Sequence, residues 1–111
     1  MRNEKELLLD ILEAIEKIEK HSARGDQVFY QDEMVQVWII YYIQVIGEAA
    51  SKLPLSLRRR HPKIPWLDIV DMRNVLVHRY FGIDLKEIWN TVNVDIPELK
   101  DNIIKILDEF K

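Results

Sequence analysis

Three side chains suited to phosphate chemistry and proton transfer recur within one short apolar segment. They are Arg73, His78 and Tyr80, in the stretch "DMRNVLVHRY" that spans residues 71–80. Arginine stabilises charge on phosphate oxygens, and histidine titrates near neutral pH and can move protons. The apolar spacing predicts a helix with Arg73 in the middle of its apolar stripe. On a straight helix, Arg73 and His78 lie about 140° apart, so one unbroken helix cannot direct both at the same atom.

A structural role is an alternative explanation for these polar residues. An arginine in an apolar stripe is costly unless it is paired. Glu48, in the segment "VIGEAA", is a candidate partner, and Gly47 beside it would let another helix approach closely. Under this interpretation Arg73 and Glu48 form a buried ion pair, His78 caps a helix end and Tyr80 packs with its hydroxyl at the rim. From spacing alone we favour this pair over a catalytic site.

Metal and cofactor chemistry find little support in the residue pattern. The three histidines, His21, His61 and His78, lie far apart, and none has a partner at zinc-ligand spacing. There are no cysteines and no phosphate-binding glycine loop. We therefore expect neither a metal nor a cofactor.

The elements that position these residues are predicted to be helices throughout. With 111 residues, of which 48% are apolar, the chain is expected to form one domain over residues 1–111. Apolar periodicity and capping residues predict an all-α, four- to five-helix up-and-down bundle. The expected helices are residues 3–22, 32–53, 65–83, 84–92 and 95 onward, with a loop at 23–30 and a short helical turn followed by a connection at 54–65.

The helix expected at residues 32–53 is apolar on almost every side. In so small a bundle, a helix of this kind is hard to enclose completely, so part of its surface is expected to meet a second copy of the chain. Its apolar run is too short to span a bilayer. The first residues also lack a basic and then apolar leader, so a cytoplasmic location without a membrane segment is expected.

Charge argues against a general nucleic-acid binder but leaves room for a local basic patch. The net charge is -3, whereas nucleic-acid binders are usually basic overall. The run "RRRHPK" at residues 58–63 is most simply a solvated helix end. The alternative is an RNA contact, for which the candidates are Arg58, Arg59, Arg60, Lys63 and Arg79.

The pattern Arg73, four residues, His78, one residue, Tyr80 resembles the Arg-x4-His-x-Tyr signature of the HEPN superfamily, and in particular its HepT branch, also called DUF86. Three longer segments resemble the same branch. They are "VIGEAASKLP" (residues 45–54), "HPKIPWLDIVDMRNVLVHRYFGIDLKEIWNTV" (residues 61–92) and "DIPELKDNI" (residues 95–103). The resemblance covers most of the chain from about residue 32 onward.

This resemblance implies the toxin of a type VII HepT–MntA-like toxin–antitoxin system. Such a toxin is a homodimeric, metal-independent endoribonuclease, neutralised by a minimal nucleotidyltransferase antitoxin. Carried over, Arg73 and His78 form the catalytic pair at the dimer interface, with Asn74 and Glu48 in support. Tyr80 matches the tyrosine that the antitoxin modifies with AMP.

A dimer would also remove the geometric objection, because two copies can bring together groups that one helix holds apart. Cleavage by the RNA 2′-hydroxyl would leave a 2′,3′-cyclic phosphate and a 5′-hydroxyl. Two other functions stay open at this point. One is a non-catalytic HEPN module that docks and regulates a nucleotidyltransferase, and the other is a bundle that senses a nucleotide.

Overall fold

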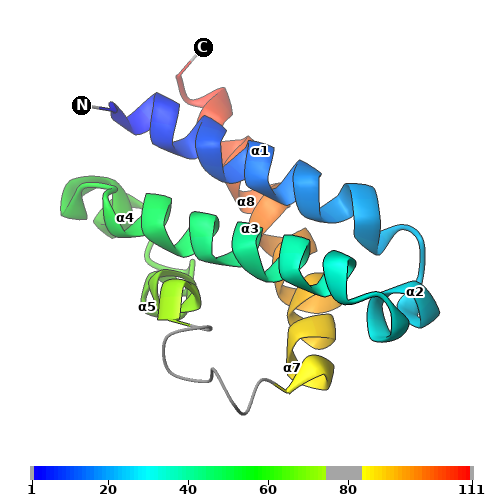
Figure 1. Ribbon diagram of the computed structural model, residues 1–111. Coiled ribbons are helices and arrows are strands. Elements are labelled where there is room, and N and C mark those ends of the chain that lie inside the picture. The colour runs from blue at the N-terminus through cyan, green and yellow to red at the C-terminus, as the bar shows by residue number, and fades with distance from the viewer. Residues whose placement is uncertain (1, 75–83, 111) are drawn as a thin grey trace.

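The computed structural model describes residues 2–74 and 84–110, and within them every regular element is a helix (Figure 1). The all-α bundle predicted from sequence is therefore confirmed. None of the described helices is long and apolar enough to cross a membrane. The elements in chain order are α1 (Glu4–Ser22), α2 (Asp26–Gln31), α3 (Glu33–Ser51), α4 (Leu55–Arg60), α5 (Trp66–Asp71), the 3₁₀ turn η1 (Met72–Asn74), α7 (Leu85–Asn90), the π turn η2 (Thr91–Asp95) and α8 (Ile96–Asp108).

The long helices α1 and α3 run antiparallel along the front of the molecule in Figure 1, and both begin at side-chain caps. Asn3 and Glu6 form a reciprocal capping box, in which the Glu6 amide donates to the Asn3 side chain at 2.8 Å. Asp32 accepts the amide of Met34 at 3.0 Å and caps α3, where the sequence predicts that a helix begins. These local bonds satisfy backbone donors that would otherwise lack partners, so the sequence alone locates both starts.

The core is one cluster of buried apolar side chains between α1, α3 and α8. From α8, Leu99, Ile103 and Ile106 are buried in it. Lys100 donates to Glu19 of α1 at 2.8 Å, which ties the last helix to the first. This hydrogen bond raises the pKa of Lys100 above its ordinary value of 10.5. The pair therefore contributes to stability below that value and loses its contribution only as pH rises through the raised pKa.

The loop predicted at residues 23–30 is wrong from Asp26 onward, because α2 forms there. Gly25 has a positive φ of 98°, which few other residues adopt, and it turns the chain from α1 into α2. Phe29 of α2 is almost fully buried and stacks on Trp89 of α7 with ring centroids 4.7 Å apart. So short a helix is marginal by itself, and this tertiary contact stabilises it.

The helix predicted at residues 65–83 is only partly continuous. It begins at Trp66, whose indole donates to the His61 carbonyl at 2.9 Å, and it runs to Asp71. The chain then tightens into the 3₁₀ turn η1, so the straight α-helix assumed from spacing is wrong at residues 72–74. Residues 75–83 lie outside the described part of the structure.

The C-terminal helices follow their predicted boundaries with one difference. Asp84 caps α7 by accepting the Lys86 amide at 2.9 Å, and α8 begins at Ile96 with Pro97 in its first turn. Asp95 was expected to open a new helix, but its backbone is already helical. The π turn η2 joins α7 to α8 without a break in helical backbone.

Helix α3 and the turn η1 approach each other closely at Gly47. A Cβ built on Gly47 would meet the backbone of Arg73, with the Arg73 Cα only 3.0 Å away. Real Cβ atoms rarely come this close to a neighbouring backbone. The sequence predicted a close approach at Gly47, and the structure confirms it. The segment that approaches is η1.

Gly47→Ala tests this contact, and the sign of the effect is informative. In an ordinary helix interior, the change would stabilise the protein by about 1 kcal/mol through helix propensity. Here the new methyl group must displace η1, and overpacking of this kind costs about 1–3 kcal/mol. We expect a net loss of stability by urea unfolding monitored by circular dichroism. A variant more stable than the original chain would contradict the close approach.

Candidate active site

The described half of the predicted site is the turn η1, which carries Arg73 and Asn74. Buried Ile69 anchors the preceding helix α5 in the core. The Gln44 side chain of α3 donates to the Arg73 carbonyl at 3.4 Å, beside the Gly47 contact. The backbone of Arg73 is therefore held against α3 at two adjacent points, while its side chain is exposed to solvent.

The predicted buried ion pair between Arg73 and Glu48 is wrong. Both side chains are exposed, and Glu48 lies 3.8 Å from Lys52 on its own helix. Since the backbone of Arg73 occupies the space over Gly47, the guanidinium stays at the surface and keeps its hydration. In the part of the chain that the structure describes, the Arg73 guanidinium has no hydrogen-bond or ion-pair partner.

The other predicted site residues of this segment divide between η1 and residues outside the described part of the chain. Asn74 is half-buried at the end of η1. His78, Arg79 and Tyr80 lie outside the described residues. Their assignment to the site stays a prediction from sequence.

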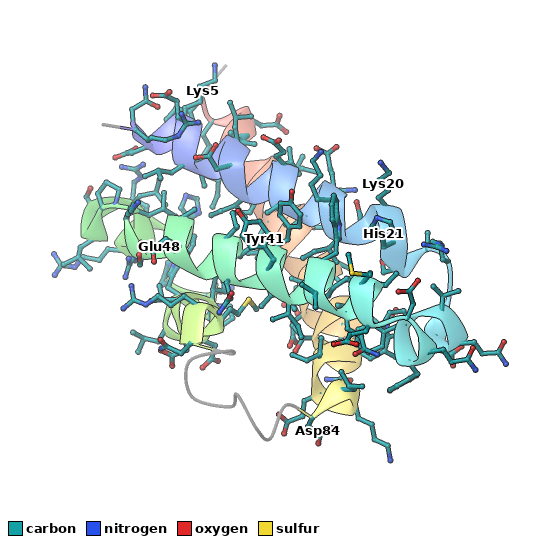
Figure 2. The ribbon with its side chains drawn as sticks, in the orientation of Figure 1. Lys5, Lys20, His21, Tyr41, Glu48 and Asp84 are labelled. Atoms are coloured by element: carbon teal, nitrogen blue, oxygen red, sulfur yellow. The ribbon has the colours of Figure 1, made fainter. Side chains whose placement is uncertain are left out.

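A row of side chains on α3 faces outward next to this turn. Met34 is 77% exposed, and Val37 and Tyr41 are each 56% exposed, which is high for apolar and aromatic side chains on a central helix. Gln44 and Glu48 continue the row at helical spacing. We call these five residues the outward face of α3, and Figure 2 shows Tyr41 and Glu48 on it. The described residues thus leave part of α3 uncovered, as the sequence predicted.

A groove of about 790 Å³ separates the outward face of α3 from the N-terminal half of α1. Tyr42, Val45 and Ala49 line it from α3, and Leu7 and Ala14 line it from α1. At its rim, Arg2 makes a two-point ion pair with Asp10 at 2.7 Å, and this contact raises the pKa of the guanidinium. Tyr41 and Glu48 also line the groove, so the groove is continuous with the outward face of α3.

Comparison with known proteins gives this arrangement a family context. The sequence matches the HepT-like family, described as ribonuclease HepT-like, over residues 11–106. The chain belongs to the HepT-like family.

Curated relatives of this HepT-like chain agree with the family match. The chain is 41% identical, over 95% of its length and 96% of the relative, to "Probable ribonuclease HepT" of Thermococcus cleftensis. It is 39% identical, over 99% of its length, to "Gamma-glutamylcyclotransferase and putative RNase" of Methanocaldococcus jannaschii, and it spans 50% of that longer protein. No solved structure matches the chain significantly.

The basic run of this HepT-like chain divides into residues with and without intramolecular partners. Arg58 donates to the carbonyls of Ala50 and Ser51 at 2.8 and 3.0 Å, which satisfies the C-terminal end of α3. Arg60 lies 3.8 Å from Glu4 of α1. Arg59 is exposed and makes no ion pair or hydrogen bond among the described residues. The predicted solvated helix end therefore fits exposed Arg59, whereas Arg58 is half-buried and its guanidinium joins α4 to α3.

Arg58 and Arg59 form a matched pair for testing this division. Arg58→Ala is expected to lower the free energy of unfolding by about 1–2 kcal/mol, because it leaves two helix-end carbonyls without their donor. Arg59→Ala removes the same charge from an exposed position and is expected to change stability by less than about 0.5 kcal/mol. Urea unfolding of both variants provides the comparison. Equal losses would show that the capping contact contributes nothing to stability.

Proposed function

We propose that this chain is a metal-independent endoribonuclease, the toxin of a type VII toxin–antitoxin pair. Membership of a family described as ribonuclease HepT-like supports an action on RNA. The observation that carries the proposal is the exposed Arg73, held by its backbone at a Gly47 contact and without an intramolecular partner in the described residues. An arginine fixed in this way is available for a phosphate oxygen.

In the proposed mechanism, Arg73 stabilises the negative charge that develops on the phosphate, and His78 transfers protons. Removal of the 2′-hydroxyl proton lets that oxygen attack the adjacent phosphorus. The bond to the 5′-oxygen then breaks, and this oxygen receives a proton. The products are a 2′,3′-cyclic phosphate and a 5′-hydroxyl end. Asn74 and Glu48 are proposed to support the site.

We propose that the active species is a homodimer formed through the outward face of α3. Exposed Met34, Val37 and Tyr41 offer the apolar surface that a second copy would cover. The two-fold axis of such a dimer would pair identical surfaces. Since Gln44 lies on this face and contacts the Arg73 carbonyl, each Arg73 would lie near the interface.

The first test compares the original chain with Arg73→Ala and His78→Ala on single-stranded RNA in the presence of EDTA. We expect each substitution to lower the cleavage rate by at least about 100-fold, as removal of a proton-transfer or charge-stabilising group does. Mapping of the fragment ends should show cyclic phosphates. Identical traces from all three proteins would contradict the proposal and favour the non-catalytic module that docks a nucleotidyltransferase.

Mixing the two inactive variants then tests whether the site is shared between subunits. If Arg73 of one copy acts with His78 of the other, the mixed dimer contains one intact site and one site in which both residues are alanine. Cleavage should then recover in the mixture after subunit exchange. No recovery, in a mixture that mass measurement shows to contain mixed dimers, would assign both residues of each site to the same chain.

Tyr80 is the proposed attachment point for AMP, which a cognate minimal nucleotidyltransferase would transfer from ATP. The tyrosine oxygen attacks the α-phosphate and pyrophosphate leaves. The added negative charge and bulk would repel RNA from the neighbouring site. Incubation with the partner and ATP should therefore add the mass of AMP and abolish cleavage, while Tyr80→Phe should keep cleavage and gain no mass. Modification of Tyr80→Phe at an undiminished level would assign the acceptor to another residue.

A further inference from the structure

A second surface with a distinct charge lies between the α4–α5 connection and α8. It is a pocket of about 460 Å³ with the buried side chains of Ile64 and Ile106 in its lining. Arg60, Lys63 and Lys105 bring positive charge to it, and Glu109 is the only acidic residue among the described residues that line it. We call it the basic pocket. Lys105 reaches it from α8, so the run at residues 58–63 gave no indication of this cation.

The charge of this surface changes sign along α8. A neighbouring pocket shares Ile64 and Asn102 with the basic pocket, and its three charged lining residues are all acidic: Asp68, Asp95 and Glu98. The whole chain carries a net charge of -3. Cations are therefore concentrated at one end of this surface, and an anion would be attracted there and repelled from the other end.

The cations of the basic pocket are only partly neutralised by their neighbours. Arg60 lies 3.8 Å from Glu4 and is still 53% exposed. His61 approaches Glu109 at 3.4 Å without a hydrogen bond. Lys63 and Lys105 are exposed and make no ion pair or hydrogen bond within the described residues. At least two positive charges are thus available to a ligand.

We propose that the basic pocket binds the phosphodiester backbone of RNA at nucleotides away from the cleaved bond. This inference rests on the proposed function, because it takes RNA as the substrate. Helices α3 and α4 connect the candidate site to the pocket. Arg73 contacts α3 at Gly47, and Arg58 joins the end of α3 to α4. Exposed Arg59 lies on α4 one residue before Arg60.

An extended strand suits the pocket better than a small anion does. The lysine side chains come from two separate segments and offer point charges without the fixed, closely spaced donors that enclose a single phosphate. Contacts of this kind hold a backbone in place and carry no sequence information. The pocket would therefore raise affinity for longer RNA and leave the chemistry at Arg73 unchanged.

The test measures RNA binding directly, in the His78→Ala background so that the RNA stays intact. Fluorescence anisotropy with labelled single-stranded RNA compares the double variant Lys63→Gln/Lys105→Gln with Lys20→Gln/Lys86→Gln. The control pair removes the same charge at exposed positions outside the pocket, and Figure 2 shows Lys20 near the end of α1 close to α2. The pocket pair should weaken binding about 10-fold and reduce the slope of log affinity against log salt by about 1.4, for two lost phosphate contacts.

Cleavage assays separate this inference from the proposed function. With His78 present, the pocket pair should raise KM about 10-fold and leave kcat unchanged, because only contacts outside the chemical step are lost. If both pairs bind and cleave RNA equally, the pocket has no role in RNA binding and the ribonuclease proposal stands. If the original chain neither binds nor cleaves RNA, the proposed function fails and this inference fails with it.

Discussion

The contact between Gly47 and the backbone of Arg73 is the constraint that positions η1, the described part of the candidate site. A side chain at position 47 would occupy the space that η1 takes, and the turn would have to move away from α3. With hydrogen there, the chain leaves α5 as a 3₁₀ turn and Gln44 can donate to the Arg73 carbonyl at 3.4 Å. The position of Arg73 is therefore set through its backbone, and its exposed guanidinium has no partner among the described residues.

The arginines of this chain show why residue type alone does not define a role. Arg58 donates to two carbonyls at the end of α3, whereas Arg59, next in sequence, is exposed. Arg73 lies in an apolar sequence pattern, yet its side chain reaches water because its backbone makes the contact. Helical position and tertiary packing decide which guanidinium donates to the backbone of the protein and which one is exposed to solvent.

Helix α3 has one buried side and one exposed side. Its buried residues, such as Ile39 and Ile43, pack in the core, and its outward face exposes Met34 and Val37. A helix that is apolar all round but only half covered leaves surface that water solvates poorly. In our proposal a second copy covers this surface, which links the stability of the assembly to the formation of the site.

Sequence by itself determined the helical class, the starts of α1 and α3 near residues 3 and 32, and the family, because capping residues, apolar periodicity and motif spacing are local properties of the chain. It also identified Gly47 as a place of close approach. Tertiary structure alone decided that η1 is the segment that approaches, that Arg73 and Glu48 stay apart, that α2 is helical and that Lys105 joins the basic run. Each of these depends on contacts between residues distant in sequence, such as Phe29 with Trp89. Local spacing cannot reveal such contacts, because the free energy that selects them arises only when the helices pack.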